Sequence, residues 1–88
     1  MNIRAATRGD AESIAAIGQC VWIDTYATDG LRTSLSTYAD AKFSGERIAN
    51  EMDYRKFEVF ELRDHLIGYA EVLENEERLE LKSLYILP

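Results

Sequence analysis

The spacing of apolar residues changes near Tyr54, and this change constrains the fold more than any other feature of the sequence. Upstream, apolar and small residues recur at three- and four-residue steps, at Ile14, Ile17, Gly18, Val21 and Trp22. Such spacing builds one face of an amphipathic helix, which needs a second surface to cover it. Downstream, KFEVFEL alternates Phe57 and Val59 with Glu58 and Phe60, which predicts a strand. We therefore expect helices that pack against a sheet.

The elements before Tyr54 are marked by capping residues. NIRAA at 2–6 predicts a first strand, and Thr7 followed by Asp10 resembles a capping box that starts the first helix. Residues 31–53 have a weaker helical period and predict one or two short helices, with Ser44 as N-cap of the second. The apolar positions of this stretch are Leu35, Tyr38, Ala39, Phe43, Ile48 and Met52.

The remainder of the chain predicts a three-strand antiparallel meander. The strands are expected at 56–62, 66–74 and 78–88, joined by polar turns at 63–65 and 75–77. The last strand ends in the apolar stretch LYIL before Pro88, with nothing after it to cover that stretch. The fold class is therefore α+β, a strand and helices followed by the meander.

Composition limits the protein class. With 47% hydrophobic and 30% charged residues and no flexible linker, the 88 residues predict one folded domain, 1–88. The net charge of −6 repels phosphate backbones, so nucleic acid is not an expected partner. No apolar run approaches the ~20 residues that span a bilayer, so we expect no membrane partner. One cysteine and one histidine cannot build a conventional zinc site, and Cys20 is interpreted as a small buried hydrophobe in a reducing cytoplasm.

This order of elements resembles the opening of the GNAT N-acetyltransferase fold. IRAATRGDAESIAAI is similar to the first strand and helix of that family, and VWIDTY is similar to a Trp-x-x-Thr-Tyr run near the end of the helix. LELKSLYILP resembles the family's fourth strand, where Leu-Tyr-Val-hydrophobic-Pro leads into the coenzyme-binding loop. The resemblance runs from Ile3 to Pro88 and corresponds to the N-terminal half, or somewhat more, of a family member.

The resemblance implies transfer of acetyl from acetyl-CoA to a small-molecule amine. It assigns cofactor binding to main-chain groups of Leu84, Tyr85 and Ile86, which would pair with the pantetheine arm. It makes Glu80 the candidate catalytic base, although a solvent-facing carboxylate is the favoured interpretation of Glu80, because five glutamates lie within residues 71–80. The family's Gln/Arg-x-x-Gly-x-Gly/Ala loop, whose amides hold the pyrophosphate, is absent. The five glycines are isolated, at Gly9, Gly18, Gly30, Gly45 and Gly68. The 88-residue chain is therefore expected to be inactive, a truncated domain that ends before this loop.

Other candidate residues favour structural roles. A triad of Asp64, His65 and Ser83 is set aside, because adjacent Asp and His side chains seldom converge and no nucleophile-elbow pattern surrounds the serine. Trp22 and Tyr26, one helical turn apart, are interpreted as core and rim rather than as an acceptor pocket.

A second hypothesis for the function of the chain is self-association rather than catalysis. The chain is then a noncatalytic domain that forms a homo-oligomer through the exposed edge of its last strand, because unpaired strand edges and apolar surface seek partners.

Overall fold

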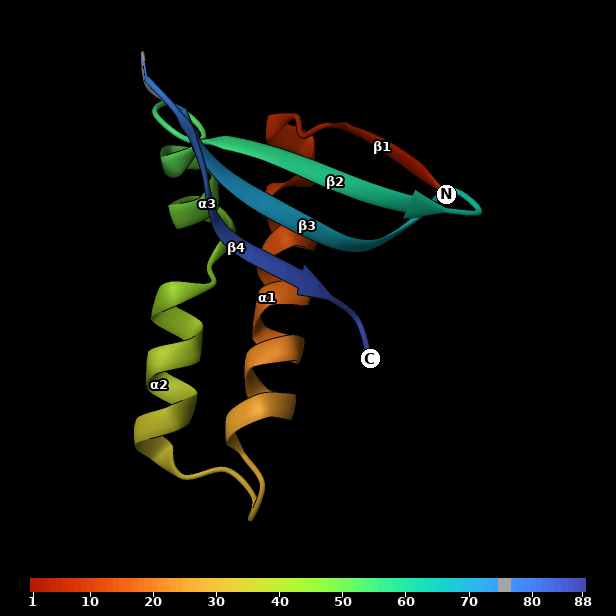
Figure 1. Cartoon of the computed structure of the whole chain (residues 1–88). Coiled ribbons are helices and arrows are strands. Elements are labelled where there is room, and N and C mark those ends of the chain that lie inside the picture. The colour runs from red at the N-terminus through yellow and green to blue at the C-terminus, as the bar shows by residue number, and fades with distance from the viewer. Residues whose placement is uncertain (75–76) are drawn as a thin grey trace.

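The computed structural model describes residues 1–74 and 77–88, and in these residues helices pack on one side of an antiparallel sheet (Figure 1). The strands are β1 (Asn2–Ala5), β2 (Lys56–Leu62), β3 (His65–Glu74) and β4 (Leu79–Ile86). A short 3₁₀ helix, η1 (Arg8–Asp10), precedes α1 (Ala11–Tyr26), α2 (Thr33–Lys42) and α3 (Gly45–Glu51). The α+β class and the order of strand, helices and meander are confirmed.

The strands lie in the order β1-β2-β3-β4, each antiparallel to its neighbour. The sequence-based meander is therefore extended at one side by β1, which pairs with β2. One row of residues crosses the whole sheet at a single level: Arg4, Val59, Tyr69 and Tyr85 are successive cross-strand partners. Side chains in one such row point to the same face, so this row defines the face toward the helices.

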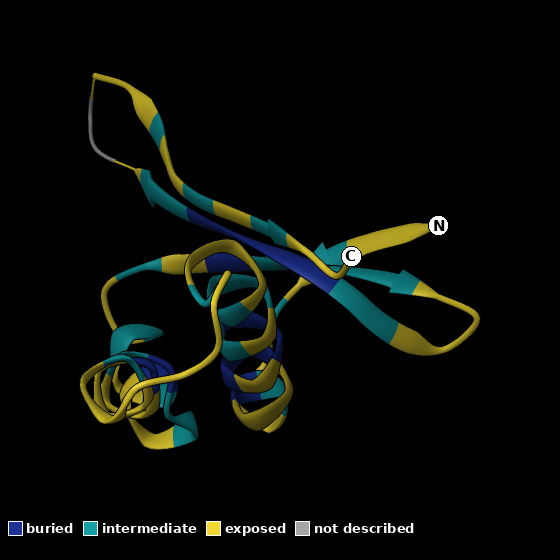
Figure 2. Ribbon diagram, turned by 90° about the horizontal axis from the view of Figure 1, so that it is seen from below, coloured by how far each residue is buried: buried dark blue, intermediate teal, exposed yellow. Residues whose placement is uncertain are grey.

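The core lies between α1 and this inner face of the sheet. Ile14 of α1 and Val59 of β2 are fully buried, and the ring of Phe43, just after α2, is 3% exposed. Figure 2 shows buried residues gathered along α1 and the middle of β3, with the α-helices on one side of the sheet. Within residues 1–74 and 77–88, no helix is long and apolar enough to cross a membrane.

The predicted capping residues have their expected contacts. The Thr7 N–H donates to Asp10 Oδ2 at 2.8 Å, but this capping box starts η1, and α1 begins only at Ala11. The Ser44 Oγ accepts from the Arg47 N–H at 3.1 Å, which confirms Ser44 as the N-cap of α3. The stretch 31–53 therefore forms two helices, because the chain leaves α2 at Phe43 and a new cap starts the next helix.

Some sequence-based expectations were wrong. Cys20 is exposed, because it lies two residues after buried Gly18 and so faces the opposite side of α1. The turn expected at 63–65 needs only Arg63 and Asp64, whose φ angles of 53° and 65° suit a two-residue hairpin, and His65 already belongs to β3. The first strand ends at Ala5 and the last at Ile86. In the predicted turn 75–77, residues 75 and 76 lie outside the described residues.

Candidate functional site

Strand β4 has one edge that no other described strand covers. Its residues pair with β3 on the other side, with Leu84 opposite Ala70 and Ile86 opposite Gly68. The Leu87 N–H donates to the Ile67 carbonyl at 2.8 Å, so at this level the main chain of Leu87 faces β3. Because main-chain groups alternate along a strand, those of Leu84 and Ile86 face the uncovered edge. We call these groups the free edge of β4.

The side chains of the same segment alternate between the two faces of the sheet. Tyr85 points to the helices, where its ring centroid lies 5.8 Å from that of Phe43 in an edge-on contact and 5.2 Å from that of Tyr69. Leu84 and Ile86 lie on the opposite face and are 55% and 46% exposed. The site residues expected from the sequence, Leu84 to Ile86, therefore combine an anchored ring with two exposed apolar side chains.

The exposed face of the sheet carries further apolar residues. Phe60 and Ile86 flank Gly68, since an added Cβ at Gly68 would lie 2.6 Å from Ile86 Cδ1 and 3.1 Å from Phe60 Cδ2. Together with partner residues in the same rows, they form what we call the outer face: Ile3, Phe60, Leu81, Leu84 and Ile86. No helix among the described residues covers this face (Figure 2).

Glu80 lies near the hairpin that joins β3 to β4, opposite Leu73. Its carboxylate is 41% exposed and lies 3.6 Å from Lys82 Nζ and 4.0 Å from Arg78 Nη2. A register shift in the β3–β4 pairing separates Glu80 from the Leu84 segment. The structure thus gives Glu80 exposed ion pairs and places it away from the anchored ring of Tyr85.

The sequence did not single out Glu71, which is the one charged residue that is buried among those the structure describes, at 8% exposure. It lies on β3 opposite Ser83, and its Oε1 forms a short ion pair with Arg55 Nη1. The Ser83 Oγ donates to Glu71 Oε2 across a long contact of 3.4 Å. The hydrogen bond to Glu71 also raises the pKa of Arg55.

A small cavity of about 70 Å³ adjoins this pair between α3, β3 and β4, lined in part by Tyr69 and Tyr85. Burial raises the pKa of the Tyr69 hydroxyl. Of the sequence signals, only alternation in phase with Tyr69 could have placed Glu71 inside, because several glutamates share its neighbourhood.

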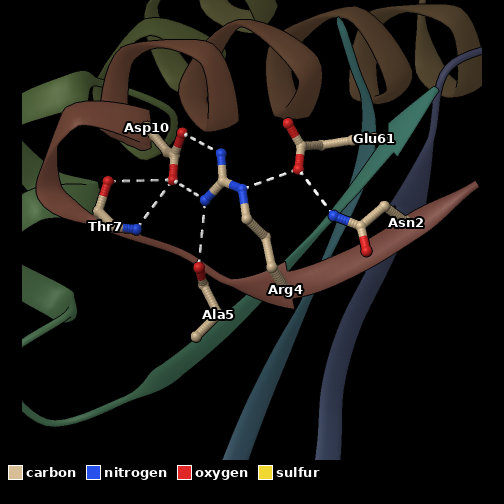
Figure 3. A network of polar contacts seen from close by, with 6 residues as sticks. All are labelled: Asn2, Arg4, Ala5, Thr7, Asp10 and Glu61. Carbon is tan, nitrogen blue, oxygen red and sulfur yellow. Dashed lines mark hydrogen bonds and ion pairs between the residues drawn. The ribbon is translucent and has the colours of Figure 1, made fainter. Parts of the chain in front are cut away.

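A second polar network joins β1, η1 and β2 (Figure 3). Arg4 contacts both oxygens of Asp10, at 2.8 and 3.0 Å, and Glu61 Oε1 at 2.9 Å. The hydrogen bonds from Arg4, with the Thr7 N–H, lower the pKa of Asp10 to about 2. This network holds the first strand to the start of the helical layer and has the character of a structural clamp.

The side chains of His65 and Ser83, considered above as a triad with Asp64, do not contact each other in the structure. The His65 Nδ1 lies 2.8 Å from the Arg63 carbonyl, at the β2–β3 hairpin. Ser83 instead contacts Glu71, further along β3. The hydroxyl and the imidazole therefore have different partners at different levels of the sheet.

The aromatic pair on α1 fits its predicted core-and-rim role. Trp22 is half-buried against the core, whereas Tyr26 is 60% exposed. The Trp22 ring centroid lies 5.1 Å from those of both Tyr26 and Tyr38, so the three rings form one cluster joining α1 to α2. The rings contact one another and stabilise the helix pair.

The fold has solved counterparts. The chain superposes with a TM-score of 0.82 and 25% identity on the PaiA N-acetyltransferase of Thermoplasma acidophilum in complex with coenzyme A, over 99% of this chain and 58% of that one. The chain has a partial GNAT fold. A GCN5-related N-acetyltransferase from Rhodopseudomonas palustris gives a TM-score of 0.71 at 20% identity, over 99% of this chain and 52% of that chain.

An aminoglycoside 6'-acetyltransferase of type Ii shares the GNAT fold at a TM-score of 0.64 and 16% identity, over 100% of this chain and 52% of that enzyme. The chain thus spans little more than half the length of these GNAT structures. No protein-family model matches the sequence, and no curated protein matches it.

Proposed function

We propose that this chain is the part of an acetyl-CoA-dependent N-acetyltransferase that orients the thioester, with a small-molecule amine as acceptor. The observation that carries the proposal is the superposition on an N-acetyltransferase in complex with coenzyme A, at a TM-score of 0.82 over 99% of this chain. The free edge of β4 supports it, since it offers main-chain donors and acceptors of the kind that an extended ligand can pair with.

The main-chain groups of Leu84 and Ile86 suit the pantetheine arm, which carries amides that can pair as an added strand would. A free-edge N–H that points at the acetyl carbonyl would stabilise the oxyanion formed when the amine attacks. The ring of Tyr85, packed against Phe43 and Tyr69, would hold this segment of β4 in place. The acetyl group is supplied by acetyl-CoA, and Glu80 is proposed to accept the amine proton directly or through water.

The start of α3 is a poor cradle for the pyrophosphate of coenzyme A. The start of α3, with Gly45, lies against Glu12, since an added Cβ at Gly45 would be 3.0 Å from Glu12 Cγ. Glu46 adds a carboxylate in the first turn of α3, which repels a phosphate rather than binding it. We therefore propose that the 88-residue chain by itself does not bind acetyl-CoA measurably. Calorimetric titration of this chain tests that statement, and micromolar affinity would contradict it.

A chimera tests the acetyltransferase proposal itself. This chain is fused to the part of the Thermoplasma acidophilum PaiA N-acetyltransferase that it does not cover, and the chimera is titrated with acetyl-CoA. We expect binding that Leu84→Pro weakens, because proline removes an outward N–H while the ladder to β3 stays paired. Leu31→Pro, in the exposed connection before α2, is the matched control. A folded chimera without coenzyme binding, or with equal binding after Leu84→Pro, would reject the proposal.

Glu80 is tested in the same chimera by Glu80→Gln, with Glu58→Gln on the other face of the sheet as the control. If Glu80 is the base, acetylation of an amine should slow while acetyl-CoA affinity stays unchanged. Equal acetylation rates for the two variants would show that Glu80 is not the base and that its ion pairs with Arg78 and Lys82 are structural.

Self-association is a second candidate function, favoured by the outer face and the free edge lying on the same strand. Two copies that meet along β4 would pair main-chain groups and cover Leu84 and Ile86 together. We propose a homo-oligomer of this kind for the isolated chain. A cytoplasmic location is proposed with it, because the lone Cys20 has no second cysteine for an internal disulfide and a free thiol fits a reducing compartment.

A further inference from the structure

The pairing of β3 with β4 contains one irregularity, at Lys82. Glu71 lies opposite Ser83, but the next residue of β3, Val72, lies opposite Leu81. Lys82 is thus the extra residue of a β-bulge in the described ladder. A bulge disrupts pairing locally and re-aims the residues that follow, so it persists where something selects it over the regular ladder.

The regular ladder is an available alternative with a definite geometry. If the pairing of Val72 with Leu81 continued without the extra residue, Lys82 would lie opposite Glu71 and Ser83 opposite Ala70. Every later residue of β4 would change face, because a one-residue slip inverts the alternation of side chains. A lysine would then meet a buried carboxylate, which is an attraction that favours the slipped register.

The structure shows why this attraction does not prevail. Glu71 already has a cation, Arg55, whose main-chain N–H is fixed by the Glu51 carbonyl at 2.8 Å. A second cation brought to the same buried carboxylate would lie close to the guanidinium, which is partly exposed, and the two like charges would repel. In the observed register Lys82 pairs instead with exposed Glu80, at 3.6 Å.

We infer that Arg55 and Glu71 are positioning residues that select the bulged register of β4. Arg55 saturates Glu71, and the uncharged Ser83 is then the side chain that fits opposite it, with its hydroxyl toward Glu71 Oε2. Tyr85 supports the same choice, because the slip would turn its ring away from Phe43 and onto the outer face. The Arg55–Glu71 pair and the Phe43–Tyr85 contact therefore both favour the bulged register of β4.

The register decides which main-chain groups form the free edge. In the bulged register these belong to Leu84 and Ile86, and after a slip they would belong to Ser83 and Tyr85. That this edge serves acetyl-CoA rests on the proposed function. The choice of register does not, so it is measured without any coenzyme.

The test is nuclear magnetic resonance of the 88-residue chain. Ala70 and Leu84 are a non-hydrogen-bonded pair in the bulged register, so their α-protons are close enough for a strong cross-strand nuclear Overhauser contact. Arg55→Gln should replace this contact by one between Ala70 and Ser83. Adding Lys82→Gln to Arg55→Gln should restore the first contact, because the competing cation is gone. Lys56→Gln, which removes a cation from an exposed pair, is the control and should change neither contact.

Retention of the Ala70–Leu84 contact in Arg55→Gln would overturn the inference. Should that variant fail to fold, Arg55→Gln is combined with Glu71→Gln, which leaves a neutral pair of similar shape and nothing to attract Lys82. This double variant should keep the Ala70–Leu84 contact, and its loss would equally overturn the inference. Neither outcome depends on coenzyme binding, so failure here differs from failure of the acetyltransferase proposal.

Discussion

The ring of Phe43 lies directly on the backbone of Gly18. A Cβ added at Gly18 would be 2.3 Å from Phe43 Cδ1, and both residues are buried. The ring also contacts Tyr85 of β4, so this close approach couples α1 to the strand that carries the free edge. The missing side chain of one helix residue thus makes room for the aromatic ring that anchors the candidate site.

Gly18→Ala is expected to destabilise the protein. The added methyl group forces the buried ring to move, which costs about 1–3 kcal/mol, while alanine returns roughly 1 kcal/mol of helix propensity. We expect a net loss of up to about 2 kcal/mol in the free energy of unfolding, measured by urea denaturation. Gly9→Ala is the control, because its nearest neighbouring atom is Thr7 Oγ1 at an ordinary 3.6 Å. A gain in stability for Gly18→Ala would show that the ring is not held as described.

Asp10 is expected to make the free energy of unfolding fall at acidic pH. Hydrogen bonds from Arg4 lower its pKa from 3.8 to about 2 in the folded protein. A depressed folded-state pKa contributes stability above the unfolded value, and that contribution is lost as the pH falls from about 4 to about 2. Allowing for screening by solvent around the half-exposed Arg4, the contribution is about 1 kcal/mol.

The measurement is thermal unfolding of the wild type and of Asp10→Asn between pH 7 and pH 2. The difference in stability between the two should be largest near neutral pH and should shrink below pH 4. The control is the pair of Arg8 with Asp53, which lies on the surface: Asp53→Asn should have a smaller effect on stability. A pH-independent difference for Asp10→Asn would contradict the clamp.

Ser44→Ala should remove the N-cap of α3. The Ser44 Oγ accepts from the Arg47 N–H at 3.1 Å, and such caps contribute about 1 kcal/mol. For a domain of this size that loss lowers Tm by about 4–8 °C. Ser36→Ala, at an exposed position inside α2, is the matched control, and alanine there should be neutral or slightly stabilising. Equal effects at both serines would count against the cap.

Leu84→Lys should abolish self-association while the chain stays folded. Leu84 is 55% exposed on the outer face, so a lysine there costs little in the monomer but repels a second copy and must be desolvated in a dimer. Light scattering should report a dimer for the wild type and a monomer for the variant. Leu31→Lys, also 54% exposed but outside the sheet, should leave the dimer intact. A wild type that is a folded monomer at high concentration would refute self-association.

Local sequence signals predicted most of the elements because their causes are local. The alternation of KFEVFEL gave the bounds of β2 residue by residue, and the Ser44 cap marked the start of α3. The wrong prediction for Cys20 shows that the hydrophobicity of a residue does not place it without its position on the helix. Cysteine is apolar, but Cys20 follows Gly18 by two residues and therefore lies on the solvent side of α1.

The candidate site was predictable in part. The Leu84–Ile86 segment could be recognised by its resemblance to a family strand, but the division of its main-chain groups between β3 and the free edge required the ladder. Alternation with Tyr69 could have placed Glu71 on the inner face, but its ion pair could not be recognised, because Arg55 lies on the preceding connection and reaches Glu71 only in the folded chain.

By itself, the sequence determined the α+β class, the order of the elements and their caps, since periodicity and capping act over one or two turns of chain. Only the tertiary structure decided that β1 joins the sheet, that Phe43 rests on Gly18 and that the β3–β4 ladder bulges at Lys82. The physical reason is that these features arise where segments distant in sequence compete for the same space or the same charge. Such competition is resolved by packing and desolvation in the folded molecule.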